Sequence, residues 1–252
     1  MKDPMYLLLL LSISFSSCFA QIKGEGDIVD RQLKTGDFKS VKLKGSFNMI
    51  VTQGERNVSA TGHGNIIDRL ETTVENGTLI LKLEKGNYRD YKLTVNVAAP
   101  DLNMIALAGS GDVWINDFST KDMDVILDGS GDIVSKGKLD LNNRLNVRLS
   151  GSGDIKLDLI ADNIESEVDG SGDIRLKGKT SMLTTSVNGS GDFHGQELKS
   201  DNCVASVNGS GDVRVNVTTE LTGKVNGSGD IKFKGDPKVN SNVRGSGSIN
   251  SL

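Results

Sequence analysis

The tetrapeptide Gly-Ser-Gly-Asp recurs from residue 109 onward and constrains the fold more than any other feature of the chain. It occupies residues 109–112, 129–132, 151–154, 170–173, 189–192, 209–212 and 227–230, and a Gly-Ser-Gly-Ser variant occupies 245–248. Successive copies begin 18 to 22 residues apart. A period this short and steady is typical of a solenoid, in which each repeat forms one coil stacked on the previous one.

The residues around the tetrapeptide alternate between apolar and polar. The position two before each first glycine is apolar, from Leu107 to Val243, and so is the residue after each aspartate, from Val113 to Ile231. A period of two indicates β-strands with one buried face. In this register the glycines point inward and the serines and aspartates point outward. Glycine suits the corner of a narrow coil because no Cβ hinders close approach of the backbone.

The coil length and the alternation together predict the fold class. We expect an all-β chain whose residues 101–252 form a right-handed parallel β-helix (solenoid) with coils of about 18–22 residues, each with three short faces. Residues 21–100 carry the alternation only in blurred form, as in 41–51, and Asn76-Gly77 predicts a hairpin turn. This irregular β-rich N-terminal part is expected to start the stack and to cover its first open edge.

The first twenty residues, 1–20, have the features of a secretory signal peptide. An apolar run is followed by small residues, which predicts cleavage after Ala20. In the competing interpretation Cys18 is the lipidated first residue of the mature protein. Both predict export to the periplasm or the cell surface, with a lipid anchor if Cys18 is the mature N-terminus. No later apolar run reaches 18 residues, so no transmembrane segment is expected.

Composition and charge exclude one class of partner. The net charge is −4, and the 29 Lys and Arg residues are scattered among 33 Asp and Glu. Nucleic acid is therefore not an expected partner, because phosphate binding requires a concentrated positive surface. After removal of the signal peptide the one remaining cysteine is Cys203, which shares the parity of apolar neighbours and is interpreted as a small core residue.

Stacking is expected to place the aspartates of the repeat in one outward row, about 4.8 Å apart. Like charges at that distance repel by somewhat under about 1 kcal/mol in water. Backbone N–H groups, serine hydroxyls, nearby Lys or Arg, or a bound cation could offset this repulsion. We expect a structural, turn-capping role and no cofactor, with Ca²⁺ as the alternative. The candidates for a cation ladder are Asp112, Asp132, Asp154, Asp173, Asp192, Asp212 and Asp230.

An enzyme is the main alternative to a binding protein. Parallel β-helices also host polysaccharide lyases and hydrolases, which use clustered carboxylates. Catalysis requires one coil that differs from its neighbours, whereas these coils are nearly identical. His63 and His194 lie in different parts of the chain, and His194 takes an outward position filled by Lys or Arg in other coils. We therefore assign no catalytic residue. Trp114, also outward, is interpreted as packing at the junction with the N-terminal part or as an anchor for a partner.

One family combines these features. The signal peptide, the segment Leu-Lys-Gly-Ser-Phe-Asn-Met-Ile-Val at residues 43–51 and the serial Gly-Ser-Gly-Asp make the chain similar to the putative auto-transporter adhesin, head GIN domain family, over residues 36–250. The resemblance implies an exported bacterial protein with a parallel β-helix fold and a role in adhesion. It implies no catalytic or binding residues.

The sequence thus leads to two functional hypotheses. The first is an exported non-enzymatic β-helix protein, an adhesin or cell-envelope scaffold that binds surface glycans or proteins. The alternative is a carbohydrate-active enzyme, a polysaccharide lyase or hydrolase, on the same fold. The final coil, residues 242–252, is not followed by a capping segment in the sequence, and an open strand edge predicts homo-oligomerisation through the C-terminal end.

Overall fold

The computed structural model describes residues 21–252, which form a β-solenoid of about seven turns. The expected signal peptide, with cleavage after Ala20 or lipidation at Cys18, lies outside the described residues. Within residues 21–252, no helix is long and apolar enough to cross a membrane.

The N-terminal part combines parallel coils with antiparallel hairpins. Its elements are β1 (Gln21–Lys23), β2 (Ile28–Gln32), β3 (Ser40–Gly45), β4 (Asn48–Gln53), β5 (Asn57–His63), α1 (Gly64–Ile67), β6 (Leu70–Glu75), β7 (Thr78–Leu83), β8 (Asn87–Arg89) and β9 (Leu93–Ala99). Strands β5 and β6 pair antiparallel with β9 and β7, and β2 pairs antiparallel with β5. The expected turn at Asn76-Gly77 joins β6 to β7, and both residues have a positive φ.

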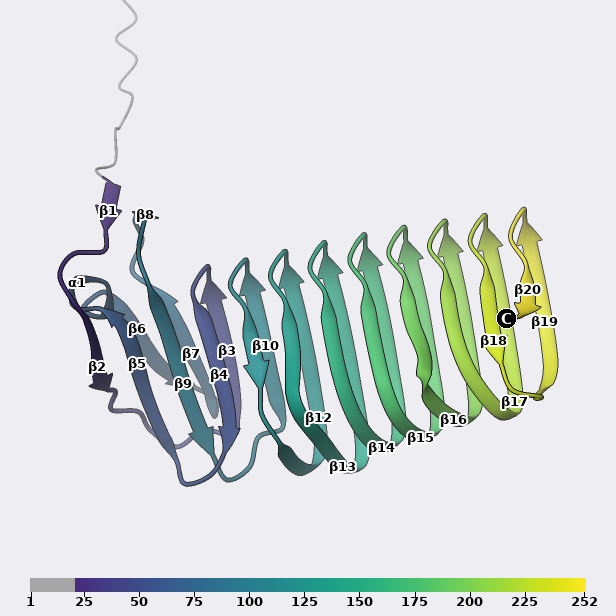
Figure 1. The fold of residues 1–252 in the computed structure, drawn as a ribbon, viewed down its shortest axis with the longest axis horizontal. Helices are drawn as coiled ribbons and strands as arrows, with labels where there is room; N and C mark the ends of the chain where they lie inside the picture. Colours follow the sequence, from purple (N-terminus) through teal and green to yellow (C-terminus); the bar gives the residue numbers. More distant parts are fainter. Residues whose placement is uncertain (1–20) are drawn as a thin grey trace, which may run out of the picture.

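The first coil lies between the cap and the rest of the solenoid. Strands β3 and β4 pair in parallel with β7 and β9 on one side and with β10 and β11 on the other. The chain therefore makes one coil, builds a cap on one side of it with residues 57–99, and then extends the stack on the other side (Figure 1). Antiparallel strands at the cap end leave no parallel coil edge open there.

The regular part consists of long strands, each carrying most of one coil. Its elements are β10 (Met104–Gly109), β11 (Val113–Ile115), β12 (Phe118–Gly129), β13 (Ile133–Gly151), β14 (Ile155–Gly170), β15 (Ile174–Gly189), β16 (Phe193–Gly209), β17 (Val213–Gly227), β18 (Ile231–Lys234), β19 (Lys238–Gly245) and β20 (Ile249–Ser251). Neighbouring coils pair in parallel and align their first glycines, as Gly151 with Gly170 and Gly189 with Gly209. The predicted parallel β-helix and its coil length are confirmed.

Each coil has two long faces, where the spacing had suggested three short ones. In β14 the buried positions alternate from Ile155 to Ala161, two consecutive residues, Asp162 and Asn163, are exposed, and burial resumes at Ile164. This break marks a bend of the coil. Before it the odd-numbered residues face the core, and after it the even-numbered residues do. Figure 1 shows the coils bending at the lower edge and ending in arrows at the upper edge, where the tetrapeptides connect one coil to the next.

The core is a thin layer of stacked Val, Ile and Leu side chains between the two faces. One inward row runs through Val147, Ser166, Thr185 and Ala205, so that it is built from small and medium-sized side chains. The fully buried ring of Phe193 takes up the space beside Gly195, the next inward residue of the strand. A Cβ added to Gly195 would lie 2.7 Å from this ring. Large and small residues therefore compensate one another between rows.

Candidate functional site

The tetrapeptide forms a corner in which backbone stacks directly on backbone. At a representative corner, the N–H groups of Ser190 and Gly191 both donate to the carbonyl oxygen of Gly170, at 2.9 and 3.0 Å. A Cβ on Gly191 would lie 2.0 Å from the carbonyl oxygen of Gly172 in the preceding coil. Glycine is therefore required because a side chain would collide with the backbone of the preceding coil along the stacking axis. The sequence had suggested glycine only for an inward-facing corner.

The seven aspartates form one ladder along these corners, as the sequence predicted. Each carboxylate accepts a hydrogen bond through Oδ1 from the backbone N–H at the equivalent position of the next coil, with N···O distances of 2.8 to 3.2 Å. The members are Asp112, Asp132, Asp154, Asp173, Asp192, Asp212 and Asp230. The ladder continues at both ends, where Asn48 accepts from the Asp112 N–H and Ser248 donates its N–H to Asp230. Each aspartate thus ties one coil to the next.

A row of cationic side chains compensates the charge of five of these aspartates. It consists of Lys156, Arg175, Arg214 and Lys232, each two residues after a ladder aspartate, and in the coil between Arg175 and Arg214 the same position holds His194. Arg175 lies 2.7 Å from Asp173 Oδ2 and 3.3 Å from Asp154 Oδ2, so it bridges two coils. Arg214 bridges the pair of coils that follows at 2.8 and 3.1 Å. The regular recurrence of Lys and Arg at this position is the sequence signal for the row.

Two of the aspartates show the effect of these neighbours on their pKa. Burial alone raises the pKa of Asp154, but hydrogen bonds from Lys156 and from the Asp173 N–H, with the charge of Arg175, outweigh it and hold that pKa below the ordinary 3.8. For Asp230, the Ser248 hydroxyl contributes most to lowering the pKa. Both carboxylates are therefore ionised at neutral pH, as a charge-paired ladder requires.

The first two aspartates of the ladder have a different environment. Asp112 and Asp132 form no ion pair within residues 21–252, because the equivalent positions two residues later hold Trp114 and Val134. Trp114 lies beside Ile50 of the first coil and Val134 of the next, and all three are half-buried. The outward face near the cap thus carries an apolar strip in line with the cationic row. The contact with Ile50 places Trp114 at the junction with the N-terminal part, as predicted.

Asp173, Asp192 and His194 bring three ligand atoms within 4.8 Å of one another. His194 Nε2 lies 3.4 Å from Asp173 Oδ2 and 3.8 Å from Asp192 Oδ2. The same two oxygens are in contact with Arg175 and Arg214, at 2.7 and 3.1 Å. A divalent cation would have to displace both guanidinium groups, which already satisfy the carboxylates. We therefore assign no metal to this cluster.

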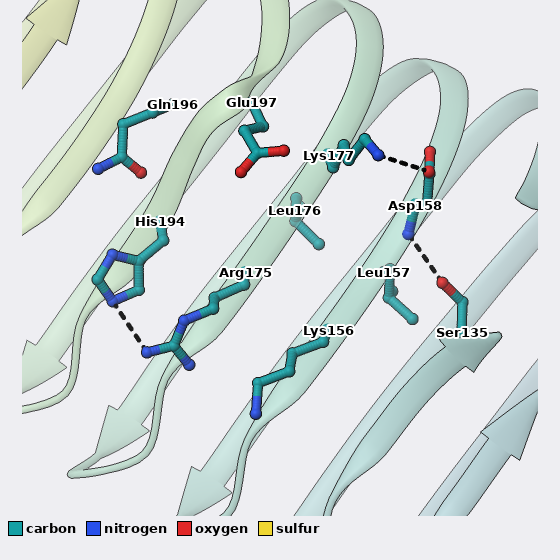
Figure 2. Close-up of a pocket in the computed structure, with 10 residues that line it drawn as sticks. All are labelled: Ser135, Lys156, Leu157, Asp158, Arg175, Leu176, Lys177, His194, Gln196 and Glu197. Carbon is teal, nitrogen blue, oxygen red and sulfur yellow. Dashed lines mark hydrogen bonds and ion pairs between the residues drawn. The ribbon is translucent and has the colours of Figure 1, made fainter.

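A shallow groove of about 350 Å³ lies beside the cationic row (Figure 2). Its walls carry charges of both signs, with Lys177 paired to Asp158 at 3.4 Å and Glu197 on the next coil. His194 extends into the same region and lies 3.5 Å from Arg175. The groove therefore presents alternating polar groups from successive coils, which suits contact with a polar surface. Sequence reasoning did not identify it, because the walls use residues at different positions of the repeat.

Cys203 is buried in the core row, as the sequence predicted. Burial raises its thiol pKa to about 12, so the thiol stays protonated and unreactive at neutral pH.

Comparison with known proteins places this geometry in a family. The sequence pattern of the family described as putative auto-transporter adhesin, head GIN domain, matches residues 37–143 and again 126–237. None of the curated proteins compared with the chain matches it.

Several solved structures are similar to the chain. One is a putative lipid binding protein from Parabacteroides distasonis, with 28% identity, a TM-score of 0.85, and coverage of 92% of this chain and 100% of that one. A putative adhesin from Bacteroides fragilis has 26% identity, a TM-score of 0.69 and the same coverage. A putative adhesin from Parabacteroides merdae, at 20% identity, covers 92% of this chain and 99% of its own with a TM-score of 0.86, and supports the fold alone. The two family matches together span most of the chain, which belongs to the putative auto-transporter adhesin, head GIN domain family.

Proposed function

We propose that the protein is an exported, non-enzymatic adhesin or cell-envelope scaffold that binds surface glycans or proteins along the sides of its solenoid. The family assignment and the similarity to the putative adhesin from Bacteroides fragilis support the adhesin role. Export, directed by residues 1–20, is part of the same proposal, with the mature protein beginning after Ala20 or lipidated at Cys18.

The uniformity of the aspartate ladder is the observation that carries the proposal. Each of the seven carboxylates accepts the same backbone hydrogen bond, and those from Asp154 to Asp230 also contact a cationic side chain. A general acid and a general base need different environments that separate their pKa values. From Asp154 to Asp230 the ladder provides the same environment five times, which favours a structural and binding role over catalysis.

The groove is the part of this surface that we assign to the contact. Lys177 and Gln196 line it outside the ladder, so they can be changed without removing a ladder contact. Charges of both signs at its walls suit a polar glycan or protein surface, and repetition along the stack allows several weak contacts to add.

The test measures binding of the fluorescent protein to intact bacterial and epithelial cells, together with release of sugar from soluble polysaccharides. We expect saturable binding without sugar release. The double variant Lys177→Glu/Gln196→Ala should bind less, whereas Lys121→Glu, an exposed charge reversal away from the groove, should bind as wild type does. Release of oligosaccharides would instead support a lyase or hydrolase, and absence of binding to every surface would overturn the adhesin role.

We further propose that two copies associate through their C-terminal ends. All residues of the edge strand β19 are exposed, and Val239 and Val243, which continue inward rows of the stack, are 37% and 42% exposed. A second copy has a terminal coil of the same cross-section. Its β19 strand and its valines can therefore cover the exposed strand edge and valines of the first copy. Sedimentation velocity should show concentration-dependent dimers that Val243→Lys abolishes. A wild-type monomer at high concentration would contradict this association.

A further inference from the structure

One coil near the N-terminal end lacks the tight corner of its neighbours. Strands β7 and β9 belong to the cap coil, and residues 84–92 connect them where later coils use the tetrapeptide. Within this connection β8 pairs with β1 and not with a neighbouring coil. Figure 1 shows β1 and β8 beyond the upper edge on which the corners lie. The wider connection leaves a cavity of about 520 Å³ beside the first corner.

The cavity combines an aromatic pair with polar side chains. Tyr88 and Tyr91 line it with ring centroids 5.9 Å apart at 62°. Arg89 and Asp90, which form an ion pair at 3.0 Å, and Asn48 of the first corner line it as well. A site of this size, with aromatic walls and a few convergent polar groups, falls within the range of small-ligand pockets, about 300–1,000 Å³.

Asn48 has a free donor group at this site. Its Oδ1 accepts the hydrogen bond from the Asp112 N–H at 3.1 Å, which fixes the orientation of the amide. Its Nδ2 has no hydrogen-bond partner within residues 21–252 and remains available to a ligand. Asn48 stands where later coils carry the ladder aspartate, so the first corner offers donors where the others offer a carboxylate.

The walls of the cavity are held in place by contacts outside it. The Tyr88 hydroxyl donates to the carbonyl oxygen of Glu84 at 2.9 Å. The Lys92 N–H donates to His63 Nδ1 at 3.0 Å, and the His63 N–H donates to the Lys92 carbonyl oxygen at 3.1 Å. Asp90 has a φ of 49°, a left-handed conformation that Asp and Asn adopt more readily than most residues. A rigid pocket loses little conformational entropy when it binds a ligand.

We propose that this cavity, the tyrosine pocket, binds one sugar ring of a surface glycan. The apolar face of the ring stacks on Tyr88 or Tyr91, and its hydroxyls exchange hydrogen bonds with Asn48, Arg89 and Asp90. Aromatic stacking with convergent amide, carboxylate and guanidinium groups matches the chemistry of a sugar, which has one apolar face and a rim of hydroxyls. The inference rests on the proposed adhesin function and identifies both a binding site and a ligand class for it.

The test is saturation-transfer NMR on the chain of residues 21–252. The probes are glucose, galactose, mannose, fucose, N-acetylglucosamine, glucuronic acid and N-acetylneuraminic acid. We expect transfer to at least one sugar, and binding weaker by about tenfold in Tyr91→Ala, as loss of an aromatic contact predicts. Asp90→Asn keeps a residue that tolerates the positive φ and should weaken binding through loss of the carboxylate alone. Trp114→Ala, which removes an outward aromatic side chain outside the cavity, is the matched control and should bind as wild type does.

The outcomes separate this inference from the proposed function. Absence of transfer to every probe, or equal binding by wild type, Tyr91→Ala and Asp90→Asn, overturns the tyrosine pocket. If wild type still binds cells in that case, the adhesin role stands without it. If the sugar binds in the pocket but no cell surface is bound, the pocket stands and the adhesin role fails.

Discussion

At the scale of single residues, the ladder aspartates act as structural links between coils. Asp192 accepts the N–H of Asp212 at 2.8 Å through one oxygen and contacts Arg214 at 3.1 Å through the other. The side chain is partly buried, so its hydrogen bond is shielded from competition with water. One carboxylate therefore satisfies both the backbone and the cation of the neighbouring coil.

Removal of this carboxylate should destabilise the stack. Asp192→Ala leaves the Asp212 N–H without its acceptor and Arg214 with one partner fewer, which should lower the free energy of unfolding by about 1–3 kcal/mol. Asp192→Asn keeps an Oδ1 acceptor and should lose less. Urea denaturation measures both variants. Equal stability of Asp192→Ala and wild type would show that the ladder contributes nothing.

The ladder also predicts how stability changes in acid. The pKa of Asp154 is held below its ordinary 3.8 in the folded state, so its contribution to stability is present above that value and is lost as the pH falls through the lower, folded-state pKa. Wild type should therefore lose stability in this acidic range. Asp154→Asn, which cannot titrate, should show a flatter decline in urea denaturation. A decline of the same steepness in both proteins would contradict the assignment.

At the scale of the structural element, the corner depends on the second glycine of each tetrapeptide. In Gly191→Ala the new Cβ would lie 2.0 Å from a backbone carbonyl oxygen, and backbone cannot move aside as a side chain can. We expect a loss of about 3 kcal/mol or more, at or above the upper end for overpacked sites. Ser190→Ala, an exposed change in the same corner, should alter the melting temperature little. Similar melting temperatures for both variants would refute the close-stacked corner.

The inward row of the long strands contains a site where stability can be gained. Thr185 is 1% exposed and its hydroxyl has no hydrogen-bond partner within residues 21–252. Thr185→Val has nearly the same shape and removes the unsatisfied hydroxyl, so the free energy of unfolding should rise by about 1 kcal/mol. Thr184→Val, the exposed neighbour, should change it little. A destabilised Thr185→Val would indicate that the hydroxyl is hydrogen-bonded in solution.

In the whole molecule, the repeat and the covering role of residues 21–100 were readable from the sequence, whereas the strand pairing inside the cap was not. Val and Ile on both sides of each tetrapeptide set the register, and stacking then placed every ladder aspartate correctly. The bend at Asp162 and Asn163 was missed because each polar residue alone fits an outward position. The hairpin of β6 and β7 was predicted from its turn, but the other antiparallel pairings of the cap were not, because they join segments far apart in sequence, such as β2 with β5.

The candidate sites show the same division. The cationic row recurs at a fixed position and could be read once the ladder was known. The tyrosine pocket depends on the pairing of β8 with β1 in place of a neighbouring coil. This pairing joins segments far apart in the sequence, so no local sequence pattern predicts it. The groove depends on which of several outward rows lie side by side. Repeated contacts are thus visible in the sequence, whereas sites that depend on how segments far apart in sequence pack together are not.

The repeated tetrapeptides are used for stacking, and we therefore assign binding to the sides of the solenoid and to the cap. Calorimetric melting of residues 21–252, in chelator and with increasing calcium, tests it most directly, because a ligand that binds only the folded state at about 100 times its Kd adds about 2.7 kcal/mol per site. We expect the same melting temperature throughout, because a backbone N–H group already occupies Oδ1 of every ladder aspartate and Lys or Arg side chains contact Oδ2 of the five from Asp154 to Asp230. A melting temperature that rises steadily with calcium would contradict it and make the aspartates a cation-binding array.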